Sequence, residues 1–179
     1  MKSFILGVVL GLLLVPFGGY LYIKSGSMPL ATSDSPLPLE KFMAKTALRA
    51  RIGKEYPRSV PIQPTEDNMV AGARIYREDC AFCHGLPQQP EPDAAKGMFP
   101  HPPQLFDPNH MVTDDPPGVT FWKAKNGIRL TGMPGFHARL SDNQMWQVSL
   151  LLAQADKVPP AAMQELAITP AAATPAHAQ

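Results

Sequence analysis

Cys80-Ala81-Phe82-Cys83-His84 is the most informative segment of this sequence. Two cysteines that are separated by two residues and followed directly by a histidine form the attachment pattern of a c-type haem. One turn of backbone sets the two sulfurs at the separation of the two porphyrin vinyl groups, and it turns the next imidazole under the ring as the proximal iron ligand. The chain has only these two cysteines, so no third thiol competes. We therefore expect one covalent haem c, bound by Cys80, Cys83 and His84.

Paired cysteines also occur in dithiol redox sites and in zinc sites. Dithiol sites usually lie in a strand–helix context of thioredoxin type, and no βαβ pattern surrounds Cys80. A zinc site would need a fourth ligand, which His101, His110 or His137 could supply. None of these histidines belongs to a second paired motif, so haem is favoured over both alternatives.

The composition describes a small domain with extensions. The chain has 179 residues and a net charge of +1, which gives no reason to expect a nucleic-acid partner. Its 21 prolines remove backbone donors and fix φ, so they favour a few helices joined by loops over extended sheets. We expect an all-α protein.

Residues 1–24 are predicted to anchor the protein in a membrane. The run from Phe4 to Ile23 has no charged residue and is long enough to cross a hydrocarbon core of about 30 Å. A cleaved signal peptide is the alternative, but its apolar region would be shorter, about 7–15 residues, and an A-x-A-like site would follow. Lys2 and Lys24 nearly cancel as orientation signals. Thioether attachment instead places the haem domain outside the cytoplasm, on the periplasmic face of a bacterial inner membrane.

Residues 25–64 are interpreted as a linker that contains one amphipathic helix over 39–54. Its apolar side consists of Leu39, Phe42, Met43, Ala47, Leu48 and Ile52, and its basic side of Lys41, Lys45, Arg49, Arg51 and Lys54. Two interpretations stay open. The helix could lie near anionic lipid headgroups, or it could pack on the following domain with its basic side in solvent.

The compact domain is expected to begin at Thr65. Thr65 and Asp67 are N-cap candidates for a helix that delivers Cys80 to the haem edge. Several features then follow in order. Gly72 and Tyr76 lie eight and four residues before Cys80, and the cysteine motif is followed by a proline-rich segment at 99–105. The tetrapeptide TGMP and a closing helix come last, at 131–134 and 142–155.

This combination resembles the class I c-type cytochromes, and within them the small membrane-bound or secreted monohaem cytochromes with a TGMP loop. The resemblance implies an all-α cytochrome c fold over residues 65–157. In that fold Gly72 and Tyr76 let their helix cross closely against the C-terminal helix. The resemblance also implies that a backbone carbonyl around Pro100–Pro103 accepts a hydrogen bond from His84.

The sixth iron ligand is assigned to Met133. Its thioether is a soft ligand that favours Fe(II), and Gly132-Met133-Pro134-Gly135 lets the backbone pass close to a ring. The resemblance places the axial methionine at the same position. A histidine ligand or an open site is the alternative. Trp122 and Arg129 could bind haem propionates, but a core tryptophan and a surface arginine fit the sequence equally well. Four other methionines are assigned to core packing: Met69, Met98, Met111 and Met145.

The end of the domain and the chain's last residues are expected to differ sharply. Ser141 or Asp142 is the N-cap candidate of the closing helix. Residues 158–179 are rich in alanine and proline and poor in charged and aromatic residues. A segment of this composition buries too little apolar surface to order itself, so we expect a disordered tail.

The features together predict electron transfer by a single covalent haem ligated by His84 and Met133, in a membrane-anchored carrier or a cytochrome subunit of a respiratory chain. Because no coordination position is open, an electron carrier is favoured over an enzyme. Expected partners are a quinol-oxidising complex, a dehydrogenase or a terminal oxidase. The alternative is a haem enzyme, or a gas or redox sensor, with a displaceable distal ligand. A fixed subunit could dock through residues 39–54.

Overall fold

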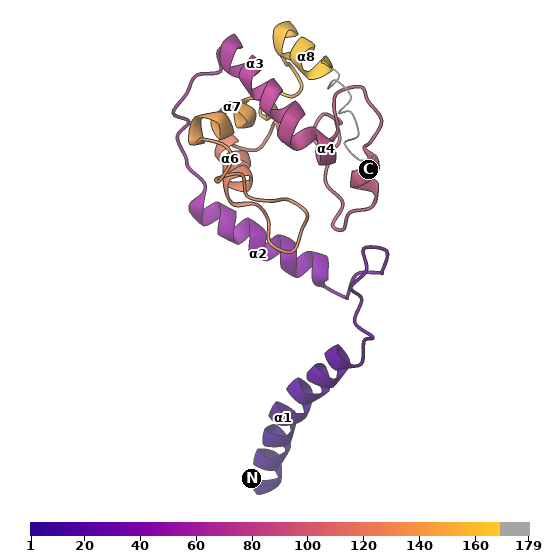
Figure 1. The fold of residues 1–179 in the computed structure, drawn as a ribbon. Coiled ribbons are helices and arrows are strands. Elements are labelled where there is room, and N and C mark those ends of the chain that lie inside the picture. Colours follow the sequence, from indigo (N-terminus) through magenta and orange to yellow (C-terminus); the bar gives the residue numbers. More distant parts are fainter. Residues whose placement is uncertain (169–179) are drawn as a thin grey trace. The chain divides into compact units, whose positions relative to one another are not determined.

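The computed structural model describes residues 1–168, and these residues form helices and loops without a strand. The prediction of an all-α protein is confirmed. Figure 1 shows the helices, which are α1 (Lys2–Lys24), α2 (Glu40–Glu55), α3 (Glu66–Ile75), the π-helical turn η1 (Tyr76–Cys80), α4 (Ala81–His84), α5 (Asp93–Lys96), α6 (Pro117–Asn126), α7 (Asp142–Leu152) and α8 (Pro160–Ala167).

The chain divides into two compact units, Met1–Phe42 and Met43–Gln179. In the first unit, α1 is long and apolar enough to cross a membrane, and none of its residues is buried by protein. A helix whose apolar side chains all face outward needs an apolar solvent around it, which a bilayer supplies.

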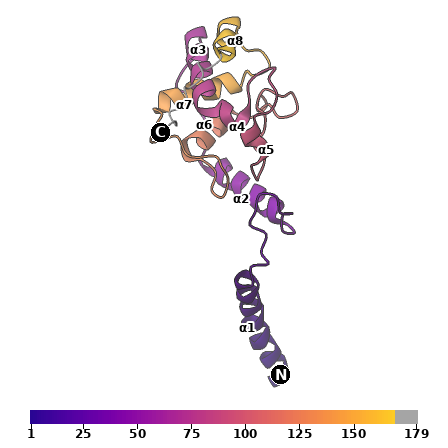
Figure 2. The same cartoon turned by 45° about the vertical axis from the view of Figure 1, so that its right-hand side comes forward.

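The core of the second unit is built where α3 crosses α7. Both helices begin with a side-chain cap: the Thr65 hydroxyl accepts from the Asn68 N–H, and Ser141 and Gln144 form a reciprocal capping box. Figures 1 and 2 show α3 lying across α7 from two directions, with α8 beside α3 and α6 beside α7. A Cβ built on Gly72 would collide with the carbonyl oxygen of Gln147, so the two backbones touch at this glycine. The close crossing expected from the resemblance is present.

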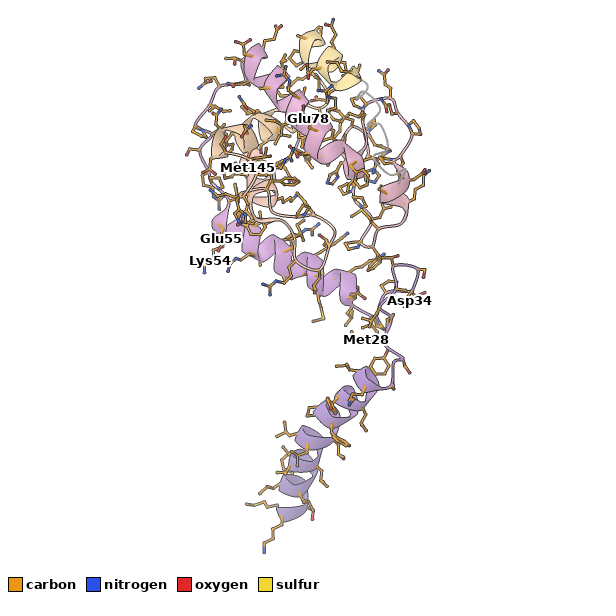
Figure 3. All side chains as sticks on the ribbon, viewed as in Figure 1. Met28, Asp34, Lys54, Glu55, Glu78 and Met145 are labelled. Carbon is orange, nitrogen blue, oxygen red and sulfur yellow. The ribbon has the colours of Figure 1, made fainter. Side chains whose placement is uncertain are left out.

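Aromatic rings fill the two sides of this crossing. The ring of Tyr76 is fully buried and meets Phe106 edge to face, with 5.0 Å between the ring centres. On the other side Trp146 of α7 stacks on Phe121 of α6 at 4.2 Å. Met145 is also fully buried in the core, and Figure 3 shows it on α7. The core therefore joins α3, α6 and α7 around the start of the cysteine motif.

The predicted disordered tail is wrong for residues 158–168. Pro160–Ala167 form α8, which packs on α3 with Ala162 and Leu166 almost fully buried. Composition suggested too little apolar surface, but two apolar residues four positions apart form a stripe that a neighbouring helix covers. Arg77 also reaches this helix, with Nη2 3.0 Å from Oε1 of Glu165. Residues 169–179, the rest of the predicted tail, lie outside the described residues.

The helix predicted over residues 39–54 has its counterpart in α2, whose C-terminal end packs within the second unit. Ile52 is buried, and the carboxylate of Glu55 accepts a hydrogen bond from Nε1 of Trp122 at 3.2 Å. A Cβ on Gly118 would collide with the carbonyl oxygen of Pro57, so the chain after α2 lies directly against α6. Met43, at the other end of the helix, is exposed. Figure 3 shows Glu55 and its neighbour Lys54 at the packed end.

Candidate haem site

The cysteine motif begins at a π-helical turn. At the end of α3 the N–H of Ala81 bonds to the carbonyl of Tyr76, five residues back, so the helix widens by one residue just before Cys80 joins α4. Wide turns of this kind are frequent at functional sites. Both cysteines have free thiols and are half-buried, whereas Phe82 between them points into solvent with 75% of its surface exposed. Cys80 therefore packs against the core, while its neighbour Phe82 faces solvent.

The thiol of Cys80 lies in a setting that disfavours its charged form. Burial, with smaller contributions from Asp79 and Cys83, raises the pKa of Cys80 to about 12. Before any covalent attachment, this side chain is therefore a protonated thiol at neutral pH. Addition of this thiol across a vinyl group would form a C–S bond at one vinyl carbon and place the S–H hydrogen on the other.

The imidazole of His84 already has the hydrogen bond that an iron ligand needs on its far side. Nδ1 lies 2.7 Å from the carbonyl oxygen of Pro103, which requires the proton on Nδ1 and leaves the lone pair on Nε2. Burial lowers the pKa of His84 and outweighs the bond to Pro103, which acts in the opposite direction. A neutral imidazole with a fixed tautomer is the form that binds iron. The acceptor expected within residues 100–103 is thus the carbonyl of Pro103.

The carbonyl oxygens of the motif's last residues are held by other side chains and backbone. The Tyr76 hydroxyl donates to the carbonyls of His84 and Gly85, at 3.0 Å and 2.8 Å. The N–H of Leu105 donates to the carbonyl of His84 at 3.3 Å. Burial, with a smaller contribution from Cys80, raises the pKa of Tyr76, so its hydroxyl stays a donor. The backbone at His84 and Gly85 is therefore held by the Tyr76 hydroxyl and, at His84, also by the N–H of Leu105.

Met133 lies in a closed turn that rests on α6. The N–H of Ile128 donates to the carbonyl of Met133 at 3.1 Å. Inside the turn the Thr131 hydroxyl donates to the carbonyl of Ile128 at 2.7 Å, and it accepts from the N–H of Met133 at 3.1 Å. Gly127 has φ of +66°, and a Cβ there would lie 2.5 Å from the nitrogen of Gly135. The lack of a side chain at Gly127 lets the backbone there touch the backbone at Gly135. Met133 is half-buried.

A second methionine lies against this turn. The methyl group of Met98 occupies the space where a Cβ on Gly132 would lie. Met98 is half-buried, as is Met111, whereas Met69 and Met145 are almost fully buried in the core. The core assignment is therefore correct for the latter two. Met98 instead links the segment after α5 to the turn at 128–135, which holds Met133 and is called the methionine loop below.

An ion pair links the two halves of the site. Nε of Arg139, three residues after Phe136, lies 2.6 Å from Oδ1 of Asp79. Asp79 precedes Cys80 directly, and only 8% of its side chain is exposed. The N–H of Phe136 in turn bonds to the carbonyl of Ala124 on α6 at 2.8 Å. The segment after the methionine loop is thus fastened both to α6 and to the turn before the cysteines.

The remaining candidates from the sequence have other partners. His101 pairs with Glu91, His110 lies 3.8 Å from Asp107, and Nδ1 of His137 is 3.0 Å from the carbonyl of Lys125. In residues 1–168, no group of three or more His, Cys, Asp or Glu side chains could hold a metal ion. Nε1 of Trp122 is used by Glu55, and Arg129 is exposed. Gln104 was missed by sequence reasoning, because no pattern in the sequence marks it. Its amide donates to the carbonyl of Cys83 in the motif and to that of Pro102.

The residues present fit a covalently bound haem. Two free, half-buried thiols stand one turn apart, and a neutral imidazole follows with its Nδ1 proton already engaged. Cys80 and Cys83 would hold the porphyrin through thioether bonds, and His84 would supply the proximal nitrogen. Once bound, the haem supplies an iron centre that gains and loses one electron.

A match to a protein-family profile agrees with this fit. No curated protein gives a significant match. A solved structure, the Kuenenia stuttgartiensis reducing HAO-like protein complex Kustc0457/Kustc0458, aligns with a TM-score of 0.47 and 24% identity. The alignment covers 54% of this chain and 47% of that one, so the present chain spans about half of that relative. Residues 67–150 match the profile of a family described as "Cytochrome C oxidase, cbb3-type, subunit III". The profile match and the all-helical fold together show that this chain contains a cytochrome c domain, a domain that binds haem c covalently and transfers electrons.

Proposed function

We propose that this protein carries electrons through a single haem c that is ligated by His84 and Met133, as a membrane-anchored carrier or as the cytochrome subunit of a respiratory complex. The observation that carries this proposal is the closed turn that holds Met133. Three hydrogen bonds define the turn, and α6 supports it through the N–H of Phe136. A thioether presented by a rigid turn is suited to remain on iron in both oxidation states.

Ligation at both axial positions favours electron transfer over substrate chemistry. A thioether stabilises Fe(II) and so raises the reduction potential, while an imidazole hydrogen-bonded to a carbonyl donates more strongly and lowers it. With both ligands bound, no position is open to oxygen or peroxide. The task of the protein is then to set the potential and to hold the ligands still during oxidation and reduction.

The proposal is tested by replacing the distal ligand with Met133→Ala. The variant should keep covalent haem, because Cys80 and Cys83 are unchanged. It should lose the methionine-to-Fe(III) charge-transfer band, and its potential should fall because Fe(II) loses its soft ligand. Visible spectra and a spectroelectrochemical titration measure both effects. Met111→Ala, which removes a half-buried methionine outside the core, is the matched control and should change neither.

Two results would contradict this assignment. One is an unchanged spectrum in Met133→Ala. The other is rapid binding of carbon monoxide by the reduced unmodified protein, which would indicate a displaceable ligand and favour the haem enzyme or sensor.

The apolar helix α1 supports a proposal about location. We propose that α1 anchors the protein in the inner membrane with its haem domain on the periplasmic face. This confines encounters with a quinol-oxidising complex, a dehydrogenase or a terminal oxidase to the membrane plane. Copurification of one such enzyme at fixed stoichiometry after detergent extraction would favour a fixed subunit. Isolation of this chain alone, with its haem, would favour a free carrier.

A further inference from the structure

The proline-rich segment at 99–105, which accepts the hydrogen bond from His84, has few backbone N–H donors of its own. Residues 100, 102 and 103 are prolines and lack an N–H, so their backbone can only accept hydrogen bonds. Pro103, whose carbonyl faces Nδ1 of His84, is exposed, so water can compete for that bond. A proline-rich segment of this kind needs hydrogen-bond donors from other groups to stay in place.

The side-chain amide of Gln104 supplies that donor. Its Nε2 donates to the carbonyl of Cys83 at 3.1 Å and to the carbonyl of Pro102 at 3.3 Å. Cys83 directly precedes His84, and Pro102 directly precedes Pro103. The amide therefore bridges the residues before the ligand and before its acceptor, and this bridge runs beside the bond between His84 and Pro103.

Two neighbours complete the arrangement. Leu105 directly follows Gln104, and its N–H donates to the carbonyl of His84 at 3.3 Å. Gly85 has φ of +70°, and a Cβ there would collide with Oε1 of Gln104. A side chain at position 85 would therefore displace the amide, and glycine leaves the space in which Gln104 packs.

We propose that Gln104 is a positioning residue for the proximal ligand: by tying Cys83 to Pro102, it holds the Pro103 carbonyl on Nδ1 of His84 and thereby contributes to the potential of the haem. The inference rests on the proposed ligation by His84. A histidine that donates a good hydrogen bond through Nδ1 is a stronger electron donor to iron and stabilises Fe(III). When Gln104 cannot donate, the bond to Pro103 weakens and the potential rises.

The experiment uses the full-length holoprotein with Gln104→Met, which keeps the length of the side chain and adds no charge. NMR of the Fe(III) form follows exchange of the hyperfine-shifted Nδ1 proton of His84 into deuterium oxide. Exchange should be about tenfold faster than in the unmodified protein, the factor that corresponds to the loss of about one hydrogen bond. A spectroelectrochemical titration should show a higher potential, and the methionine-to-Fe(III) band should be retained.

Gln147→Met is the matched control. Nε2 of Gln147 donates to Oδ1 of Asn68 at 3.0 Å, between α7 and α3, and neither residue belongs to the proline-rich segment. This variant should lower the melting temperature and leave the exchange rate and the potential unchanged. If Gln104→Met behaves in the same way, its role is only structural and the inference is wrong.

Two further cases have defined consequences. If Gln104→Met does not accumulate with haem, Gln104→Asn, whose amide is one methylene too short, is measured by the same two readouts and judged by the same criteria. If the unmodified Fe(III) protein shows no hyperfine-shifted signals from the carbon-bound protons of His84, His84 is not the ligand. That result would overturn the proposed function, and the role of Gln104 with it, before any variant is compared.

Discussion

At the residue scale, two glycines inside helices differ in whether the surrounding structure leaves room for a side chain. Gly72 and Gly53 both lie inside helices, where alanine is favoured intrinsically. A Cβ on Gly53 would meet nothing within 4 Å, whereas one on Gly72 would collide with the backbone of Gln147. Local preference therefore decides the outcome at Gly53, and tertiary contact decides it at Gly72.

Gly72→Ala is expected to destabilise the protein by about 1–3 kcal/mol, because α3 and α7 must move apart to admit a methyl group. Chemical denaturation of the holoprotein, followed by helical circular dichroism, measures this. Gly53→Ala, the control, should be neutral or stabilising by up to about 1 kcal/mol. Equal effects at both positions would mean that the helix crossing is looser than the structure shows.

At the element scale, α8 is part of the domain although its composition resembles that of a linker. Leu166 is 1% exposed, and Glu165 pairs with Arg74 and Arg77 of α3 and η1 at 3.2 Å and 3.0 Å. The exposed partner, Arg74, contributes little to stability. Arg77 is mostly buried, and Glu165 of α8 at 3.0 Å is nearer to it than its second charge partner, Glu78, at 3.6 Å. The helix therefore covers the turn that leads into the cysteine motif.

Leu166→Ala should lower the free energy of unfolding by about 2–3 kcal/mol, the lower part of the range for a buried leucine, because a surface helix can partly settle into the cavity. Ile168→Ala removes an apolar side chain that is about half exposed and should change stability by less than about 1 kcal/mol. Thermal and chemical denaturation of both holoproteins provide the comparison. A Leu166→Ala variant as stable as the parent would show that α8 does not pack on α3 in solution.

At the scale of the whole molecule, the proposed anchor and the proposed haem ligands belong to different units. Cys80, Cys83, His84 and Met133 all lie in the unit that begins at Met43. No residue of α1 is buried by protein, so the core of the haem domain has no contribution from it. Membrane attachment and redox chemistry should therefore be separable.

Replacement of residues 1–24 by a cleavable export signal should release the protein from the membrane with an unchanged haem spectrum and potential. Fractionation with haem staining, and spectra of the soluble fraction, test this. The full-length protein should stay in the pellet after alkaline carbonate washing. A shortened protein that stays on membranes and is released by high salt would instead indicate that the basic residues of α2 bind anionic lipid.

Features encoded over a few neighbouring residues were predictable from the sequence alone. The spacing of Cys80, Cys83 and His84, the apolar run within α1, and the caps at Thr65 and Ser141 depend on covalent geometry or on one turn of backbone. The all-helical class followed from these features. The assignment of Met133 as ligand also came from its local turn, and it stays a prediction until the variant is measured.

Only the tertiary structure decided which groups separated in sequence meet. Pro103 lies 19 residues after His84, Glu165 lies 88 after Arg77, and Trp122 lies 67 after Glu55. No local pattern marks such pairs, because a hydrogen bond forms wherever packing brings a donor to an acceptor, and packing depends on the whole core. For the same reason α8 and the role of Gln104 were missed. The prediction of haem attachment thus came from the sequence itself, whereas the hydrogen bonds that orient His84 were decided by the fold.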